Sequence, residues 1–183
     1  IGERAGAVRF LSRIVGPFFS KLFPGIPKGH KANGELVMNF AANMLGLDNA
    51  ATPMGLKAMQ SMQELNTDKD TASDAQIMFL ALNTSSITII PLSVLAQRSI
   101  LGAANPTDVF IPIIIATFVS TLTAILYVGF RQRLKLLDRT VIAWLGGITF
   151  AIAALVWWFS TLDRETMNTA SSIISNSLLL GII

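Results

Sequence analysis

The sequence predicts an all-α, polytopic membrane protein, and its composition and charge pattern carry this prediction. Hydrophobic residues make up 52% of the 183 residues, and the mean hydropathy is +0.58. Charged residues make up only 14%, whereas a soluble domain has about 25%. Most of the charges lie between long apolar segments, which is typical of helices that have lipid as their solvent.

An amphipathic, basic helix is predicted over residues 5–23. Arg9 and Arg13 lie four residues apart and share one helical face, while phenylalanine and aliphatic side chains form the other. A helix of this kind is suited to lie in the membrane interface. The alternative is a surface helix packed on a soluble core, which the composition of the chain disfavours.

Polar residues recur at helical spacing in the segment 34–65. Glu35, Asn39 and Asn43 are four residues apart, so they share one face of a predicted helix. An ionisable or amide side chain within an apolar segment is a candidate for function. Glu35 is an equally good candidate for a residue at the water interface, because it stands near the start of the segment.

The same segment predicts a re-entrant helical hairpin. The first helix is expected to end near Gly46, where Gly-Leu-Asp-Asn is turn chemistry, and a second to begin at Thr52 as N-cap with Pro53 following. Each helix then has about a dozen residues, or roughly 18 Å, against about 30 Å of hydrocarbon. Neither helix crosses alone, so both are expected to enter and return.

A spanning helix that is broken in its middle is predicted over residues 77–97. Consecutive Asn, Thr and Ser residues compete for backbone hydrogen bonds at its centre, and Pro91 lacks a donor. Transporters expose polar groups to a substrate with interrupted helices of this kind. The alternative is that the same hydroxyl and amide groups only join neighbouring helices by hydrogen bonds.

The rest of the chain predicts a polar, solvated loop and plainer spans. The loop covers residues 60–76 and lacks the glycine and distal glutamate of a calcium loop. Continuous apolar segments predict spans at 109–130 and 141–159, and a further span from about residue 173. The chain has no cysteine, and no metal or cofactor is expected. Both ends of the chain are expected to continue beyond the sequence.

Basic residues predict the orientation. The first 31 residues contain six Lys or Arg and one acid, and residues 131–140 contain four and one. The positive-inside rule places both regions in the cytoplasm, which requires residues 34–65 to enter and return on one side. No aromatic platform or recognition motif lies between the basic residues, so nucleic-acid binding is not expected.

Two stretches carry a resemblance to a known family. Residues 37–59 read VMNFAANMLGLDNAATPMGLKAM and residues 79–98 read FLALNTSSITIIPLSVLAQR. In order and motif they resemble the A-type spore maturation proteins, whose core is the Gate, or nucleoside-recognition, domain. The resemblance runs to about residue 130. Residues 131–183 resemble a join to the partner B-type protein: a cytoplasmic connecting loop, a scaffold helix and the start of the next span.

The resemblance implies half of a bacterial inner-membrane protein. The Gate domain is shared with concentrative nucleoside transporters and with the membrane part of ferrous iron transporters, where two repeats have inverted topology. Residues 1–130 would supply the first repeat. The second would come from downstream or from a B-type subunit, and a homo-oligomer stays open. The resemblance leaves the substrate and the coupling ion open.

The sequence and the resemblance together suggest a permease-like protein for a small polar or anionic solute. The hairpin tip near Asn49 and Thr52 would offer helix N-terminal N–H groups. The ionisable candidates are Glu35 and Asp48. Neutral hydrogen bonds would come from Asn39, Asn43, Asn83, Thr84, Ser85 and Ser86. The alternative is a membrane scaffold or assembly protein that does not transport. An enzyme is not expected, because no His or Cys lies in the apolar segments.

Overall fold

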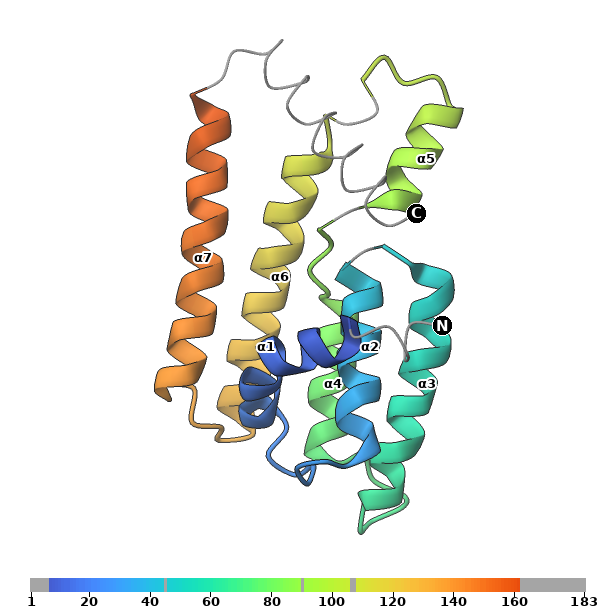
Figure 1. The fold of residues 1–183 in the computed structure, drawn as a ribbon, viewed down its shortest axis with the longest axis vertical. Coiled ribbons are helices and arrows are strands. Elements are labelled where there is room, and N and C mark those ends of the chain that lie inside the picture. The colour runs from blue at the N-terminus through green and yellow to red at the C-terminus, as the bar shows by residue number, and fades with distance from the viewer. Residues whose placement is uncertain (1–6, 45, 90, 106–107, 162–183) are drawn as a thin grey trace.

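Seven helices and no strand make up the described part of the computed structural model, which covers residues 7–44, 46–89, 91–105 and 108–161 (Figure 1). The helices are α1 (Ala7–Leu22), α2 (Lys31–Met44), α3 (Asp48–Leu65), α4 (Asp74–Thr84), α5 (Leu92–Ile100), α6 (Phe110–Arg131) and α7 (Arg139–Ser160). The predicted helical class is confirmed. The further span expected from residue 173 lies outside the described residues.

Helix α1 runs across the other helices rather than along them (Figure 1). Its last turn and the residue after it are buried through Phe18, Phe19 and Phe23. Phe18 stacks on Trp144 of α7 with 5.7 Å between ring centroids, and Phe19 meets Phe40 of α2 edge to face at 5.3 Å. Aromatic packing of this kind fixes α1 against two helices that are distant in the sequence.

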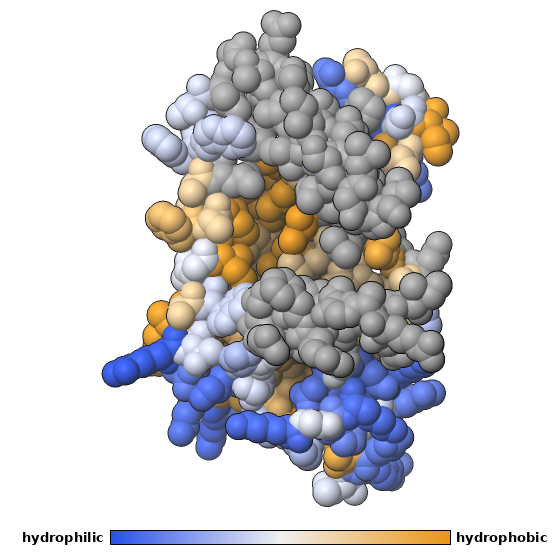
Figure 2. All heavy atoms as spheres, viewed as in Figure 1, coloured by the Kyte–Doolittle hydropathy of each residue, from blue (hydrophilic) through white to orange (hydrophobic). Residues whose placement is uncertain are grey.

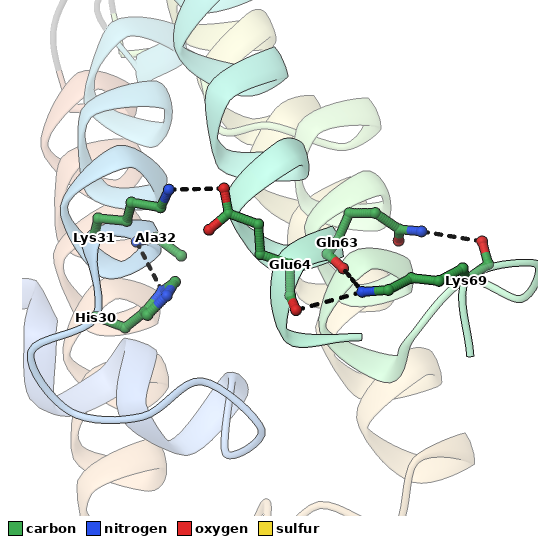
Figure 3. Close-up of polar contacts among 6 residues, drawn as sticks. All are labelled: His30, Lys31, Ala32, Gln63, Glu64 and Lys69. Carbon is green, nitrogen blue, oxygen red and sulfur yellow. Dashed lines mark hydrogen bonds and ion pairs between the residues drawn. The ribbon is translucent and has the colours of Figure 1, made fainter. Parts of the chain in front are cut away.

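Helices α2 and α3 form an antiparallel hairpin whose open end is tied by charges (Figure 3). Lys31 Nζ lies 2.8 Å from Glu64 Oε1. The hydrogen bond between them raises the pKa of Lys31 and lowers that of Glu64. Lys69 Nζ donates to the carbonyl oxygen of Gln63 at 2.6 Å and satisfies a carbonyl at the end of α3. The ion pair between Lys31 and Glu64 is exposed and contributes little to the free energy of unfolding.

The tip of the hairpin is a tight turn that differs from the prediction. Gly46 has φ +65°, and the bonds Gly46 N to Asn43 O (3.0 Å) and Leu47 N to Ala42 O (2.9 Å) end α2 in a Schellman motif. Helix α3 then begins at Asp48, so Thr52 is not the N-cap, and α3 continues to Leu65. Residues 60–65 are therefore helical instead of part of the polar loop, which is confined to 66–73.

The interrupted helix has the expected break. Helix α4 begins with a capping box between Ser73 and Gln76 and ends at Thr84. The chain is non-helical until α5 begins at Leu92, directly after Pro91. Figure 1 shows the break beside the hairpin tip and near mid-height of α6.

Helices α6 and α7 are long and apolar enough to cross a bilayer, by length and composition. Only 22% and 6% of their most apolar windows are buried. A core helix of a soluble protein would be mostly buried, so these two helices present apolar side chains outward, including Val119 and Phe150. Figure 2 shows this apolar surface at mid-height and a hydrophilic lower end.

The lower end joins the two basic regions. Lys21 at the end of α1 forms an ion pair of 2.8 Å with Asp138, and Asp138 Oδ1 also accepts from the backbone N–H of Thr140 at 2.9 Å. Asp138 thus caps α7 and holds α1. The end of α1 and the loop between α6 and α7 therefore lie on one side of the molecule, although 117 residues separate Lys21 from Asp138.

Replacing Asp138 with asparagine tests this ion pair, because asparagine keeps the cap and loses the charge. The pKa of Asp138 is lowered from 3.8, chiefly by the hydrogen bond from Lys21. The ion pair therefore adds to the free energy of unfolding above pH 3.8, and this stabilisation is lost as the pH falls through the lowered pKa of Asp138. In detergent, we expect Asp138→Asn to lower the melting temperature at pH 6, with the difference from the parent closing below pH 3.8. A difference that is unchanged at pH 2.5, or that Asp70→Asn reproduces, would contradict the assignment.

Candidate functional site

Three asparagine side chains join the hairpin to the interrupted helix. Asn43 Nδ2 donates to Asn83 Oδ1 of α4 at 2.8 Å and to Asn39 Oδ1 at 3.3 Å. Asn83 Nδ2 donates to the carbonyl oxygen of Phe79 at 3.0 Å. The predicted pair on one face of α2 therefore meets a third predicted residue from α4.

Asn39 anchors this group to the second helix of the hairpin. It is 3% exposed, and its Nδ2 donates to the carbonyl oxygen of Ala51 at 2.8 Å. This approach is possible because α3 has a glycine at position 55: a Cβ there would lie 2.9 Å from Asn39 Nδ2. The asparagine face of α2 and the glycine of α3 are thus complementary parts of one packing contact.

A hollow of about 340 Å³ lies between α2, α3 and α4; we call it the hairpin hollow. Asn39, Asn43, Thr52 and Asn83 supply its polar lining, and apolar side chains such as Leu56 supply the rest. Four of the candidate residues predicted from the sequence are therefore brought to one surface.

A second hollow, of about 430 Å³, lies at the interruption between α4 and α5; we call it the break hollow. Its lining includes Asn43, Asn83, Thr84, Ser86 and Thr117. The Ser86 hydroxyl is buried and has no hydrogen-bond partner among the described residues. A buried hydroxyl without a partner costs free energy, so its place beside a hollow marks it as a group that a ligand or water would satisfy.

Amide and hydroxyl groups give both hollows a neutral lining. Asn43 and Asn83 line the two hollows and stand between them. Asn43 uses both Nδ2 protons on asparagine oxygens, so its own Oδ1 remains as an acceptor within the described structure. No described charged side chain lines either hollow. The arrangement suits a solute with hydroxyl, amide or carbonyl groups better than an ion of high charge.

The non-helical segment is held by α2 and by α6. Ile89 N donates to the carbonyl oxygen of Met44 at 2.8 Å, which bonds the break to the end of α2. Thr88 N donates to Thr117 Oγ1 at 3.2 Å, and Thr121 Oγ1 donates to the carbonyl oxygen of Ser85. Backbone N–H and C=O groups that the interruption leaves without helical partners are thus hydrogen-bonded to α2 and to α6.

Thr117 and Thr121 were not predicted as part of the site. Their signal in the sequence is the same four-residue spacing that identified Asn39 and Asn43, here within an apolar span. Thr121 is 1% exposed, and its hydroxyl also lies 2.8 Å from the carbonyl oxygen of Thr117. The hydroxyl has one proton, so at any moment it donates either to the carbonyl oxygen of Ser85 in the break or to that of Thr117 in its own helix.

The other candidates, and the hydroxyl of Thr84, are placed differently. The hydroxyls of Thr84 and Ser85 donate to carbonyl oxygens one turn back in α4, at 2.9 and 2.7 Å, so they are turned toward their own helix. Glu35 lies in α2 outside both hollows, and its Oε2 is buried without a partner in the described chain. Asp48 and Asn49 are the first two residues of α3, and their side chains lie outside the described structure.

Comparison with known proteins gives two matches. A sequence model of the Gate family, described as nucleoside recognition, matches residues 1–100. The chain is 46% identical over 138 residues to spore maturation protein A of Bacillus subtilis (strain 168), covering 74% of this chain and 70% of that protein. No solved structure matches the chain. The matched residues 1–100 include the hairpin, the break and their asparagines.

Gly55→Ala tests the contact between the hairpin helices. The added Cβ would displace the buried Asn39 amide from Ala51, at a cost of about 1–2 kcal/mol of unfolding free energy. Gly34→Ala is the matched control, because α2 has open space there and alanine favours the helix by up to about 1 kcal/mol. Alanine brings a similar helix-propensity gain at position 55, so thermal unfolding in detergent should place Gly55→Ala below Gly34→Ala by the cost of the lost Asn39 contact, about 1–2 kcal/mol. Equal melting temperatures would mean that Asn39 is not held as described.

Thr121→Val tests the support that α6 gives to the break. Valine keeps the shape and removes the donor to Ser85, which leaves a buried carbonyl unpaired at a cost of about 1–3 kcal/mol. Thr123→Val is the control, since Thr123 is exposed and its hydroxyl donates to the carbonyl oxygen of Val119 in its own helix. We expect a lower melting temperature for the first variant and a change within about 0.5 kcal/mol for the second. Similar losses in both would argue against a role for α6.

Proposed function

Because the chain belongs to the Gate, or nucleoside-recognition, family, we propose that it is a transporter-like membrane protein. In this proposal it binds a small, uncharged polar solute at the hairpin hollow and the break hollow. Binding and passage are proposed without a chemical step, so no residue has a catalytic role. The observation that carries the proposal is the Asn43–Asn83 bond of 2.8 Å between the hairpin and the interrupted helix. Both residues line the break hollow together with Ser86, whose hydroxyl has no partner among the described residues.

The depth of the hairpin supports a membrane site. Helices α2 and α3 have 14 and 18 residues, or about 21 and 27 Å, and α6 has 22, or about 33 Å. The bilayer core is about 30 Å thick, so α6 spans it and the hairpin is short of the far side. Non-helical backbone at that depth is tolerated where it is buried in protein or lines a cavity. Both conditions fit the hairpin tip and the break.

The charges support the proposed orientation. In the proposal, the end of the molecule where Lys21 pairs with Asp138 of the loop between α6 and α7 faces the cytoplasm of a bacterial cell. Figure 2 shows this lower end as hydrophilic. The hairpin enters from that side and returns to it. A second Gate repeat, from downstream or from a B-type subunit, would close the site from the opposite direction and complete the hydrogen bonds that a solute requires.

A binding experiment with uridine as the probe tests the proposal, since the family is described by nucleoside recognition. We expect the purified full-length protein to bind uridine. Asn43→Leu and Ser86→Ala should each weaken binding about tenfold, the effect of one lost hydrogen bond of about 1.4 kcal/mol. Thr149→Val, on the outer side of α7, should leave the affinity unchanged.

Equal affinity in the parent and in Asn43→Leu would remove the hollows from the site. Flux in proteoliposomes separates the proposed role from its alternative. Uridine uptake that the two site variants reduce would support transport. Intact folding with neither binding nor flux, for uridine and for other small polar solutes, would favour a membrane scaffold that retains the fold.

A further inference from the structure

The turn between α6 and α7 leaves all of its cations exposed. From residue 131 to residue 139, exposed and half-buried positions alternate strictly. The outer row is Arg131, Arg133, Lys135, Leu137 and Arg139, and the inner row is Gln132, Leu134, Leu136 and Asp138. We call residues 131–139 the basic turn. An unstructured loop would not separate its residues in this manner.

The inner row attaches the basic turn to the rest of the molecule. Gln132 Nε2 donates to the carbonyl oxygen of Asp74 at 2.7 Å, and Asp138 forms the ion pair with Lys21. Leu136 packs so closely on Gly129 that a Cβ there would lie 2.7 Å from its Cδ2. The outer side chains are therefore presented by a fixed backbone.

One residue of the outer row is kept at a strained backbone position. Arg133 has φ +54° and closes the end of α6, where Arg133 N bonds to Phe130 O at 3.1 Å and Leu134 N bonds to Gly129 O at 2.8 Å. Glycine is the usual residue at this position, because a Cβ is strained there. An arginine at this place argues for a use of its charge.

The outer row has unbalanced charge and apolar neighbours. The one acid of the turn, Asp138, is already paired with Lys21. The four outer cations form no ion pair within the described residues. Phe130, next to Arg131, and Leu137, between Lys135 and Arg139, are 78% and 87% exposed. The turn joins the two helices that are long enough to span, so it lies at the height of the lipid headgroups.

We propose that the outer row of the basic turn binds the headgroups of anionic phospholipids. Cations then meet the phosphate groups, while Phe130 and Leu137 enter the boundary between headgroups and acyl chains. An acidic protein would pair with the cations only, and would leave the exposed side chains of Phe130 and Leu137 uncovered. The inference rests on the spanning arrangement proposed above and is independent of the solute.

Binding of a fluorescent phosphatidylglycerol to the purified full chain in neutral detergent tests the proposal. Arg133→Gly with Lys135→Gln removes two outer charges and relaxes the backbone at position 133, so the double variant should fold. At about fivefold per charge, we expect about 25-fold weaker binding. The control Lys28→Gln with Lys57→Gln removes two exposed charges elsewhere and should stay within about twofold of the parent.

Three results would overturn the proposal: equal binding of phosphatidylglycerol by the parent and the turn variant, an equal loss in the control, or preference for a poly-glutamate peptide over the lipid. Parent binding should also fall as salt is raised, and phosphatidylcholine should compete poorly. Uridine binding, measured on the same double variant, should be unchanged. Failure of lipid binding is thereby distinguished from failure of the solute site.

Discussion

Helix α2 ends at Met44 and helix α4 ends at Thr84, and the backbone groups released near these two ends depend on each other. Ile89 N bonds to Met44 O, Thr88 N bonds to Thr117, and Thr121 bonds to the carbonyl of Ser85. Buried peptide groups without partners are costly in protein and more so in lipid. The hairpin tip, the break and the middle of α6 are therefore one unit, and the rest of the fold is arranged around it.

The asparagine cluster follows from that arrangement. Once the break is bonded to the end of α2, the side chains of Asn43 and Asn83 meet, and Asn39 is held against α3 by Ala51. Asn39, Asn43 and Asn83 line the hairpin hollow, and Asn43, Asn83 and Ser86 line the break hollow. The same groups that stabilise the junction are thus those available to a solute. A solute that bound them would act directly on the contact between hairpin and break.

Local spacing was sufficient to predict the helices and the interruption, because both depend on neighbours in the sequence. The start of α3 was predicted wrongly at Thr52, although Thr-Pro is a common N-terminal signal. The turn at Gly46 orients Leu47 so that its carbonyl accepts from Ala50 and Ala51 at 2.9 Å, and Leu47 takes the N-cap position five residues before Thr52. Pro53 is then tolerated inside the helix at the loss of one backbone bond.

Contacts between distant residues were beyond the reach of spacing. The bond between Asn43 and Asn83 joins residues 40 apart, and only the folded hairpin brings them together. Ser85 stood in the predicted polar cluster, yet its hydroxyl bonds back to Ala81, a choice of rotamer that no pattern records. Thr117 and Thr121 are four residues apart, which the sequence shows, but threonines at this spacing in an apolar span commonly take part only in helix–helix contacts.

The depth of the hairpin tip tests the account most directly. The chain has no cysteine, so single cysteines at Leu47 in the tip and at Thr67 in the loop after α3 can each carry a nitroxide in proteoliposomes. Accessibility to oxygen and to a water-soluble nickel complex then reports depth. We expect the label at Leu47 near the bilayer midplane and the label at Thr67 at the headgroups. A label at Leu47 in bulk water on the side opposite Thr67 would contradict the account.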